Sequence, residues 1–249
     1  MDDNYTQKIN IGARILDSAR GNLYLAMRFM DIALCAFAYK PDEGRQMAGT
    51  DGNVIYYCPD YVMDRYEAGR GYADRLYLHM TLHCIYRHIF RISNRNVRLW
   101  NLACDIAVEH VIDGLPYGCV RMRIPAVRDL CYRKISEYTS ILNADLVYKY
   151  LENNPMDEDI LKAWENEFLV DDHTYWYRED KNSRSNMKNE QKWDDISRKM
   201  QTSMETIEKG IGHDDKNLYD SIQIENRKRY DYRDFLRKFA VYREEMHID

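Results

Sequence analysis

The chain has 249 residues, of which 45% are hydrophobic and 31% are charged, and it carries a net charge of −5. This composition is typical of a soluble globular protein with a sizeable core, and the negative charge disfavours nucleic acid as a partner. The most apolar early segment, residues 23–39, includes Arg28 and Asp31, so it is too short and too charged to span a membrane.

The cysteines and the first residues indicate the compartment. Six cysteines are scattered along the chain without a CxxC pair, and the opening residues MDDNYTQKIN are polar and partly acidic, unlike a signal peptide. We therefore expect reduced thiols in a cytoplasmic protein.

The first part of the chain is predicted to be helical and then to form a hairpin. Apolar residues recur at helical intervals from about Ile9 to Tyr39, and Pro41 ends the pattern. A turn signal at residues 50–53 precedes the β-branched and aromatic run Val54–Tyr57, which predicts a short β-hairpin. Many helices with one hairpin indicate an α+β fold that is predominantly helical.

The segment Leu76–Phe90 is predicted to be one helix that carries two histidines, His79 and His83. Their four-residue spacing places both imidazoles on one face, about one turn apart, within reach of a single metal ion. Zinc proteases have His-Glu-x-x-His at this spacing, with the Glu as general base, whereas Met80 stands at that position here. If the helix is continuous, His88 faces away from His79 and cannot join the same metal.

A second predicted helix, Leu99–Ile112, places two carboxylates on a face that it shares with apolar residues. Asp105 and Glu109 are four residues apart, so their side chains are separated by about 40° around the helix. Carboxylates are rarely buried without a cation, and a metal held by the two histidines would supply one. An exposed acidic edge, or pairing with Arg98 or Arg121, explains the same pattern without a metal.

The later part of the chain adds one candidate histidine and several charged helices. Asp157–Phe168 is predicted to be a capped helix, and His173 follows it in the polar stretch VDDHTYW. His173 is either solvated, a further metal ligand, or a substrate contact. Asn186–Lys209 and Tyr230–Glu245 are predicted to be amphipathic helices, and we expect the chain to be the front part of a longer protein.

Five short motifs, taken together, resemble a known family. They are TDGNVIYYCPDYV, HMTLH, WNLACDIAVEHVI, DDHTYW and YDYRDFLRKF. The set is similar to the bacterial metallopeptidase-type domain found in front of a von Willebrand factor A-like domain, over nearly the whole chain from about Leu23. The resemblance implies a zincin-like domain in residues 1–182, a charged helical extension in 183–249 that leads towards a von Willebrand-like part, and association with an AAA-type ATPase.

The resemblance also implies roles for individual residues. His79 and His83 correspond to the paired zinc ligands, and Asp105 to the acidic residue on the following helix. By analogy with thermolysin-like proteases, Asp105 is the third ligand and Glu109 supports a ligand histidine. Met80 departs from the family's Glu, which leaves the ligand set intact and removes the general base.

Three hypotheses for the function follow. The first is a zinc-binding, zincin-like domain whose peptidase activity is impaired or lost, because methionine cannot accept a proton from water. The second is an interaction module in which the former active-site cleft binds a peptide or protein without cutting it, working with a von Willebrand A-like domain and an AAA-type ATPase. In the third, His79 and His83 are ordinary hydrogen-bonded histidines that bind no metal.

Overall fold

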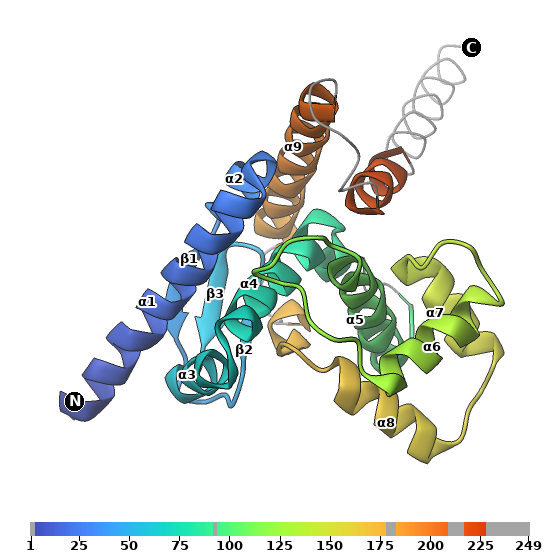
Figure 1. The fold of residues 1–249 in the computed structure, drawn as a ribbon, viewed down its shortest axis with the longest axis horizontal. Coiled ribbons are helices and arrows are strands. Elements are labelled where there is room, and N and C mark those ends of the chain that lie inside the picture. The colour runs from blue at the N-terminus through green and yellow to red at the C-terminus, as the bar shows by residue number, and fades with distance from the viewer. Residues whose placement is uncertain (1–2, 92–93, 178–182, 209–216, 228–249) are drawn as a thin grey trace, which may run out of the picture.

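The computed structural model describes residues 3–91, 94–177, 183–208 and 217–227, and it is mostly helical with one small sheet. This confirms the predicted α+β class. Figure 1 shows the sheet with α1, α3 and α4 on one side of the molecule and α5 to α8 on the other. The helices are α1 (Asp3–Ala26), α2 (Asp31–Leu34), α3 (Pro59–Ala68), α4 (Arg70–Ile85), α5 (Val97–Asp113), α6 (Ala126–Ser136), α7 (Ala144–Asn153), α8 (Glu158–Phe168), α9 (Ser183–Glu208) and an unlabelled helix at 217–227; the 3₁₀ helices are η1 (Arg28–Met30), η2 (His88–Phe90) and η3 (His173–Tyr177).

The sheet has three strands, β1 (Ala38–Pro41), β2 (Ala48–Thr50) and β3 (Val54–Tyr57), in the order β1-β3-β2. β2 and β3 are antiparallel and form the predicted hairpin, whose turn is closed by Asp51 Oδ1 accepting hydrogen bonds from the backbone N–H groups of residues 53 and 54. β1 runs parallel to β3.

β1 corrects the prediction that residues 9–39 are one helical region. α1 ends at Ala26, two short helical pieces follow, and Ala38 begins the strand. The backbone N–H of Ala38 donates to the carbonyl of Asn53, so the strand exists because it pairs with β3. Such non-local pairing is invisible to local periodicity.

Helix α4 lies at the centre of the fold, in contact with α1, α3, α5 and α9. Every residue from Ala73 to Ile85 is buried, including charged and polar ones, so each buried polar group on α4 needs a partner. The predicted helix Leu76–Phe90 is wrong at its C-terminal end. α4 ends at Ile85, Arg87 adopts left-handed backbone angles (φ 62°, ψ 28°), and the 3₁₀ helix η2 follows.

The helices on either side of the site begin where the sequence predicted. Asn96 caps α5 by accepting a hydrogen bond from the N–H of Leu99, which is typical of an N-cap asparagine. Asp157 caps α8 by accepting from the N–H of Asp159. Helix α5 carries Asp105 of the site, and α8 leads into the segment that carries Asp171 and His173.

Helix α9 packs on α2 and α4, close to the predicted span Asn186–Lys209. Trp193 is fully buried there, and its indole N–H donates to the carbonyl of Gly52 at 2.7 Å. The predicted helix Tyr230–Glu245 lies outside the described residues. Over the residues that the structure describes, no helix has the length and apolar character needed to cross a membrane.

Candidate metal centre

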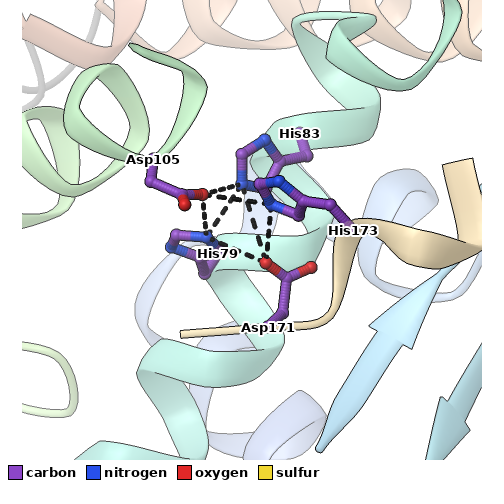
Figure 2. Close-up of side chains that lie close together, drawn as sticks. All are labelled: His79, His83, Asp105, Asp171 and His173. Atoms are coloured by element: carbon purple, nitrogen blue, oxygen red, sulfur yellow. Dashed lines mark hydrogen bonds and ion pairs between the residues drawn. The ribbon is translucent and has the colours of Figure 1, made fainter. Parts of the chain in front are cut away.

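Five side chains from three parts of the chain converge in the interior. Figure 2 shows His79 and His83 on α4, Asp105 on α5, and Asp171 and His173 on the segment that follows α8. One donor atom of each lies within 4.8 Å of the others, and all five residues are buried. The group therefore combines three imidazoles and two carboxylates in a single buried cluster.

The two histidines of α4 are neighbours because they are separated by four residues, one helical turn. The Nε2 atom of His79 lies 2.8 Å from the Nε2 atom of His83. Asp105 lies opposite them on α5, with its Oδ1 3.3 Å from His79 Nε2 and 3.2 Å from His83 Nε2. The two helices therefore present three donor atoms to one point.

The segment after α8 completes the cluster. Asp171 Oδ1 lies 2.9 Å from His173 Nε2 and 3.3 Å from His79 Nε2, and His173 Nε2 lies 3.1 Å from Asp105 Oδ1. The ring of His173 stacks on Trp176 with a centroid distance of 3.6 Å. The aromatic stack holds the imidazole with its Nε2 atom directed at the carboxylates.

The edge strand β2 anchors this segment. The N–H of Asp172 donates to the carbonyl of Ala48 at 2.7 Å. At Gly49 the approach is so close that a Cβ atom would lie 2.3 Å from the carbonyl oxygen of Asp172, so only glycine fits. From α3, Tyr61 donates its hydroxyl to the carbonyl of Val170. The backbone that carries Asp171 and His173 is therefore fastened to the sheet and to α3.

The arrangement fits a metal ion. Donors bound to one metal at about 2.0–2.2 Å lie roughly 3 Å apart, which agrees with most of the spacings above. Both carboxylate oxygens of Asp171 are buried, and in the described part of the chain neither accepts a hydrogen bond unless a ring nitrogen of His79 or His173 carries a proton. A buried carboxylate without a donor is costly, and a cation bound among the five side chains would satisfy it.

Behind His79 lies a charged network. The Nδ1 atom of His79 lies 2.8 Å from Glu109 Oε1, and Glu109 also accepts hydrogen bonds from the guanidinium groups of Arg75 and Arg128. Asp113 pairs with the same two arginines. With Nδ1–H donated to Glu109, Nε2 is the nitrogen of His79 that faces the cluster, and it could bind a metal after losing its proton.

Behind His83 lies another imidazole. The Nδ1 atom of His83 is 2.9 Å from Nδ1 of His88, so one ring donates and the other accepts. The prediction that His88 faces away assumed a continuous helix, and the left-handed turn at Arg87 makes that assumption wrong. His88 does not join the five donors, but it occupies the far side of a donor histidine.

Burial and the neighbouring charges set the protonation of the site. Burial opposes charge on His79, but its hydrogen bonds to Asp105, Asp171 and Glu109 raise its pKa well above the usual value. Burial likewise opposes charge on His173, and the same two aspartates raise its pKa to about 9.

The remaining groups shift the other way. Burial and the charge on His79 lower the pKa of His83 to about 4, and burial together with His83 lowers the pKa of His88 well below the usual value. Burial opposes charge on Asp105 and Asp171, but their histidine partners hold both pKa values below the usual range. Without a metal, the cluster therefore holds protonated His79 and His173 beside two carboxylates.

The structure brings together the residues that the sequence singled out. His79, His83, Asp105 and His173 are all in the cluster, and Glu109 lies directly behind His79 as expected. Their roles as ligands stay predictions. His173 is buried, which excludes the solvated alternative.

Other features were missed or wrongly paired. The sequence prediction did not include Asp171, although two acidic residues before a histidine are a signal for a further donor. The carboxylates of α5 are not an exposed edge, and Glu109 pairs with Arg75 and Arg128, while Arg98 pairs with acidic residues of α8.

One comparison with known proteins gives a match. Residues 13–211 match a family model described as "Putative metallopeptidase domain". No curated protein sequence and no solved structure matches the chain. The matched region begins within α1 and ends beyond α9, so it contains all five candidate donors and the helix that packs behind α4.

Proposed function

We propose that this chain, which belongs to the putative metallopeptidase domain family, binds one zinc ion through the five-donor cluster and does not use it to cleave peptides. His79, His83 and Asp105 are the first ligands, and Asp171 and His173 complete the set. Zinc bound with an open position can polarise a carbonyl group or acidify water. We propose that this chain binds the metal but does not use it to polarise a carbonyl group or to activate water.

The observation that carries the proposal is the burial of every donor. His79 and His83 have no exposed surface, Asp171 is 1% exposed, and Asp105 and His173 are each 6% exposed. Structural metal sites are closed by protein ligands, whereas catalytic sites keep one position for water or substrate. Five buried donors favour the closed kind.

The lack of a suitable base supports the same conclusion. Met80 occupies the position of the general base and is fully buried in the core. Glu109, the other candidate, accepts hydrogen bonds from His79, Arg75 and Arg128, which hold its pKa well below the usual value despite its burial. A carboxylate with three cationic or N–H partners is a poor proton acceptor.

Metal analysis tests the first half of the proposal. Plasma mass spectrometry of untagged protein should find about one zinc per chain, and His79→Ala/His83→Ala should lose it. His110→Ala is the matched control, because His110 is on α5 outside the cluster and contacts Tyr132. A wild-type protein that takes up no metal after reconstitution with zinc would refute the proposal.

Restoring the His-Glu-x-x-His signature tests the second part of the proposal, that the site cleaves no peptides. If the cluster is closed, Met80→Glu should bind zinc and still cleave no member of a broad peptide library. Hydrolysis by this variant, lost again when His79 is also replaced, would show an open position and a peptidase disabled by one residue. Hydrolysis by the wild-type protein would contradict the proposal without any variant.

A second candidate function, the interaction module, is favoured by one surface feature. A cleft of about 530 Å³ is lined by four arginines and by Tyr72 and Leu169, and the exposed residues Ile124 and Val127 lie beside it in the sequence. The four arginines are Arg65, Arg75, Arg123 and Arg128, but Glu109, Asp113 and Glu167 also line the cleft and pair with Arg75 and Arg128, so Arg65 and Arg123 supply its basic surface. An acidic and apolar segment of a von Willebrand A-like domain or an AAA-type ATPase is the proposed partner. Arg123→Glu should abolish such binding while zinc content stays unchanged.

A further inference from the structure

The turn that follows α4 is unusual in its backbone. Among the described residues, Arg87 is the only non-glycine with a positive φ. Left-handed angles cost a residue with a side chain about 1 kcal/mol, so such a turn persists only where the surroundings compensate. The compensation is found in the side chain of the same residue.

The guanidinium group of Arg87 joins three elements. It is 1% exposed, its Nε donates to Asp194 Oδ1 on α9 at 2.5 Å, and its Nη2 donates to Asn226 Oδ1 at 2.6 Å. Its Nη1 donates to the carbonyl of Ile85 at 3.0 Å, one of the carbonyls left without a helical partner at the end of α4. A buried arginine paired in this way holds one geometry, because breaking the pair would leave a charge in the interior.

This turn is what brings His88 to the metal centre. Had α4 continued, His88 would lie about 140° around the helix from His83 and could not contact it. With the turn, the two Nδ1 atoms are 2.9 Å apart, and the Nε2 atom of His83 remains 3.2 Å from Asp105 Oδ1. The contact to His88 therefore fixes which nitrogen of His83 faces the cluster.

Two further contacts hold the same turn from the C-terminal side. Tyr86 and Ser221 share a hydrogen bond at 2.6 Å, and Arg91 donates to Glu225 at 2.8 Å. Both partners belong to the helix at 217–227. The turn from Tyr86 to Arg91 is thus held by α9 and by this helix.

We infer that Asp194 is a positioning residue of the metal centre, which acts through Arg87 and His88 to orient His83. The inference rests on the proposed binding of zinc. Helix α9 then contributes to metal binding, although the five donors lie on other elements. Helix α9 is then needed for full metal affinity as well as for packing.

Two neighbouring aspartates on α9 provide a matched test. Asp194→Asn removes the charge that holds Arg87, whereas Asp195→Asn removes an exposed pair with Arg198, three residues further along the same helix. Zinc affinity is measured by competition with a chelator, and the absorption spectrum of the cobalt(II)-substituted protein reports the ligand geometry. We expect Asp194→Asn to weaken zinc binding about tenfold or more and to alter the cobalt spectrum, and Asp195→Asn to stay within about twofold of wild type.

A double variant covers the case in which Asp194→Asn alone fails to fold. In Arg87→Gly/Asp194→Asn no charge is left unpaired, and glycine adopts the left-handed turn without strain. This protein should fold and still bind zinc about tenfold more weakly, because the contacts of the Arg87 side chain to α9, to Asn226 and to the end of α4 no longer fix the turn. A folded double variant that binds zinc as tightly as wild type overturns the inference alone, whereas a wild-type protein that binds no zinc overturns the proposed function as well.

Discussion

His79 and His83 lie one turn apart on α4 and direct their Nε2 atoms at the same cluster, yet their Nδ1 atoms contact different chemistry. His79 donates to Glu109, which is held by Arg75 and Arg128. The Nδ1 atom of His83 faces the neutral ring of His88. One donor histidine is thus backed by charge and the other by a neutral hydrogen bond.

The difference has two consequences. Despite burial, Glu109 joins Asp105 and Asp171 in raising the pKa of His79, so that without a metal the ring of His79 is cationic whereas the ring of His83 is neutral. The two supports also come from different kinds of structure. Glu109 belongs to a regular helix, whereas His88 reaches its place through an irregular turn.

The largest effect that we expect is the dependence of zinc binding on pH. Zinc must displace one proton from His79 and one from His173, whose pKa is raised to about 9, while His83 is already neutral. Below pH 9 the apparent affinity should therefore fall with acidification, by up to about 100-fold per pH unit for two protons. Chelator competition between pH 6 and pH 9 measures the slope.

Calorimetry in buffers of different ionisation enthalpy counts the same protons directly. About two should be released per zinc at pH 7, and about one in His173→Gln. A zinc affinity that does not change between pH 6 and pH 9 would refute the claim that His79 is protonated and His83 neutral in the metal-free protein.

The next effect concerns Glu109, the carboxylate that accepts a hydrogen bond from His79. Glu109→Gln leaves Arg75 and Arg128 short of a buried partner, so we expect a loss of about 3–5 kcal/mol in the free energy of unfolding and a drop in zinc affinity of about 10–100-fold. Urea denaturation and chelator competition measure the two changes.

Asp113→Asn is the control, because Asp113 pairs with both arginines and accepts from Tyr132 without contacting His79. It should reduce stability and leave zinc affinity within a few-fold of wild type. If both variants lose affinity equally, the network stabilises the fold and does not support His79 in particular.

The regular half of the site could be predicted from the sequence, and the irregular half could not. His79, His83, Asp105 and Glu109 belong to two helices, so angular spacing alone placed them on the correct faces. His88 depends on the backbone of Arg87, which is held by a residue 107 positions away. No local pattern carries that information.

The same reasoning applies to the fold and to the remaining donor. The β2–β3 hairpin and the helices α5, α8 and α9 have local turn, capping and periodicity signals, and all were predicted. β1 was missed because it exists only by pairing with β3, and Asp171 was missed because backbone contacts to β2 place it. Local signals predict elements, and contacts between distant segments decide what those elements bring together.

A smaller effect on zinc affinity is expected for His88, the neutral imidazole in contact with His83. His88→Phe keeps a ring against Tyr86 and Trp100 and removes the Nδ1 atom that faces His83. The N–H of His83 would lose its acceptor, which costs about 1–3 kcal/mol of stability, and zinc affinity should fall about tenfold. Nitrogen NMR of the imidazoles should then show both tautomers of His83 in the metal-free protein. Unchanged affinity with a single tautomer would mean that the cluster alone orients His83.

The smallest effect concerns Asp74, a carboxylate of α4 that accepts hydrogen bonds from an amide, whereas Glu109 accepts hydrogen bonds from two arginines. Asp74 is 3% exposed and accepts only amide hydrogen bonds from Asn22, and burial raises its pKa from 3.8 to about 6. Because the folded-state pKa is the higher one, the protonated form favours folding, and this contribution is lost as the pH rises from about 4 through 6. The full shift corresponds to about 3 kcal/mol, which nearby solvent reduces to about 1–2 kcal/mol. Asp74→Asn should therefore stabilise the protein by that amount at pH 8 and by almost nothing at pH 4, as measured by urea denaturation. A gain that is equal at both pH values would mean that the shape of the side chain, and not the charge of the buried carboxylate, limits the stability of α4 at this position.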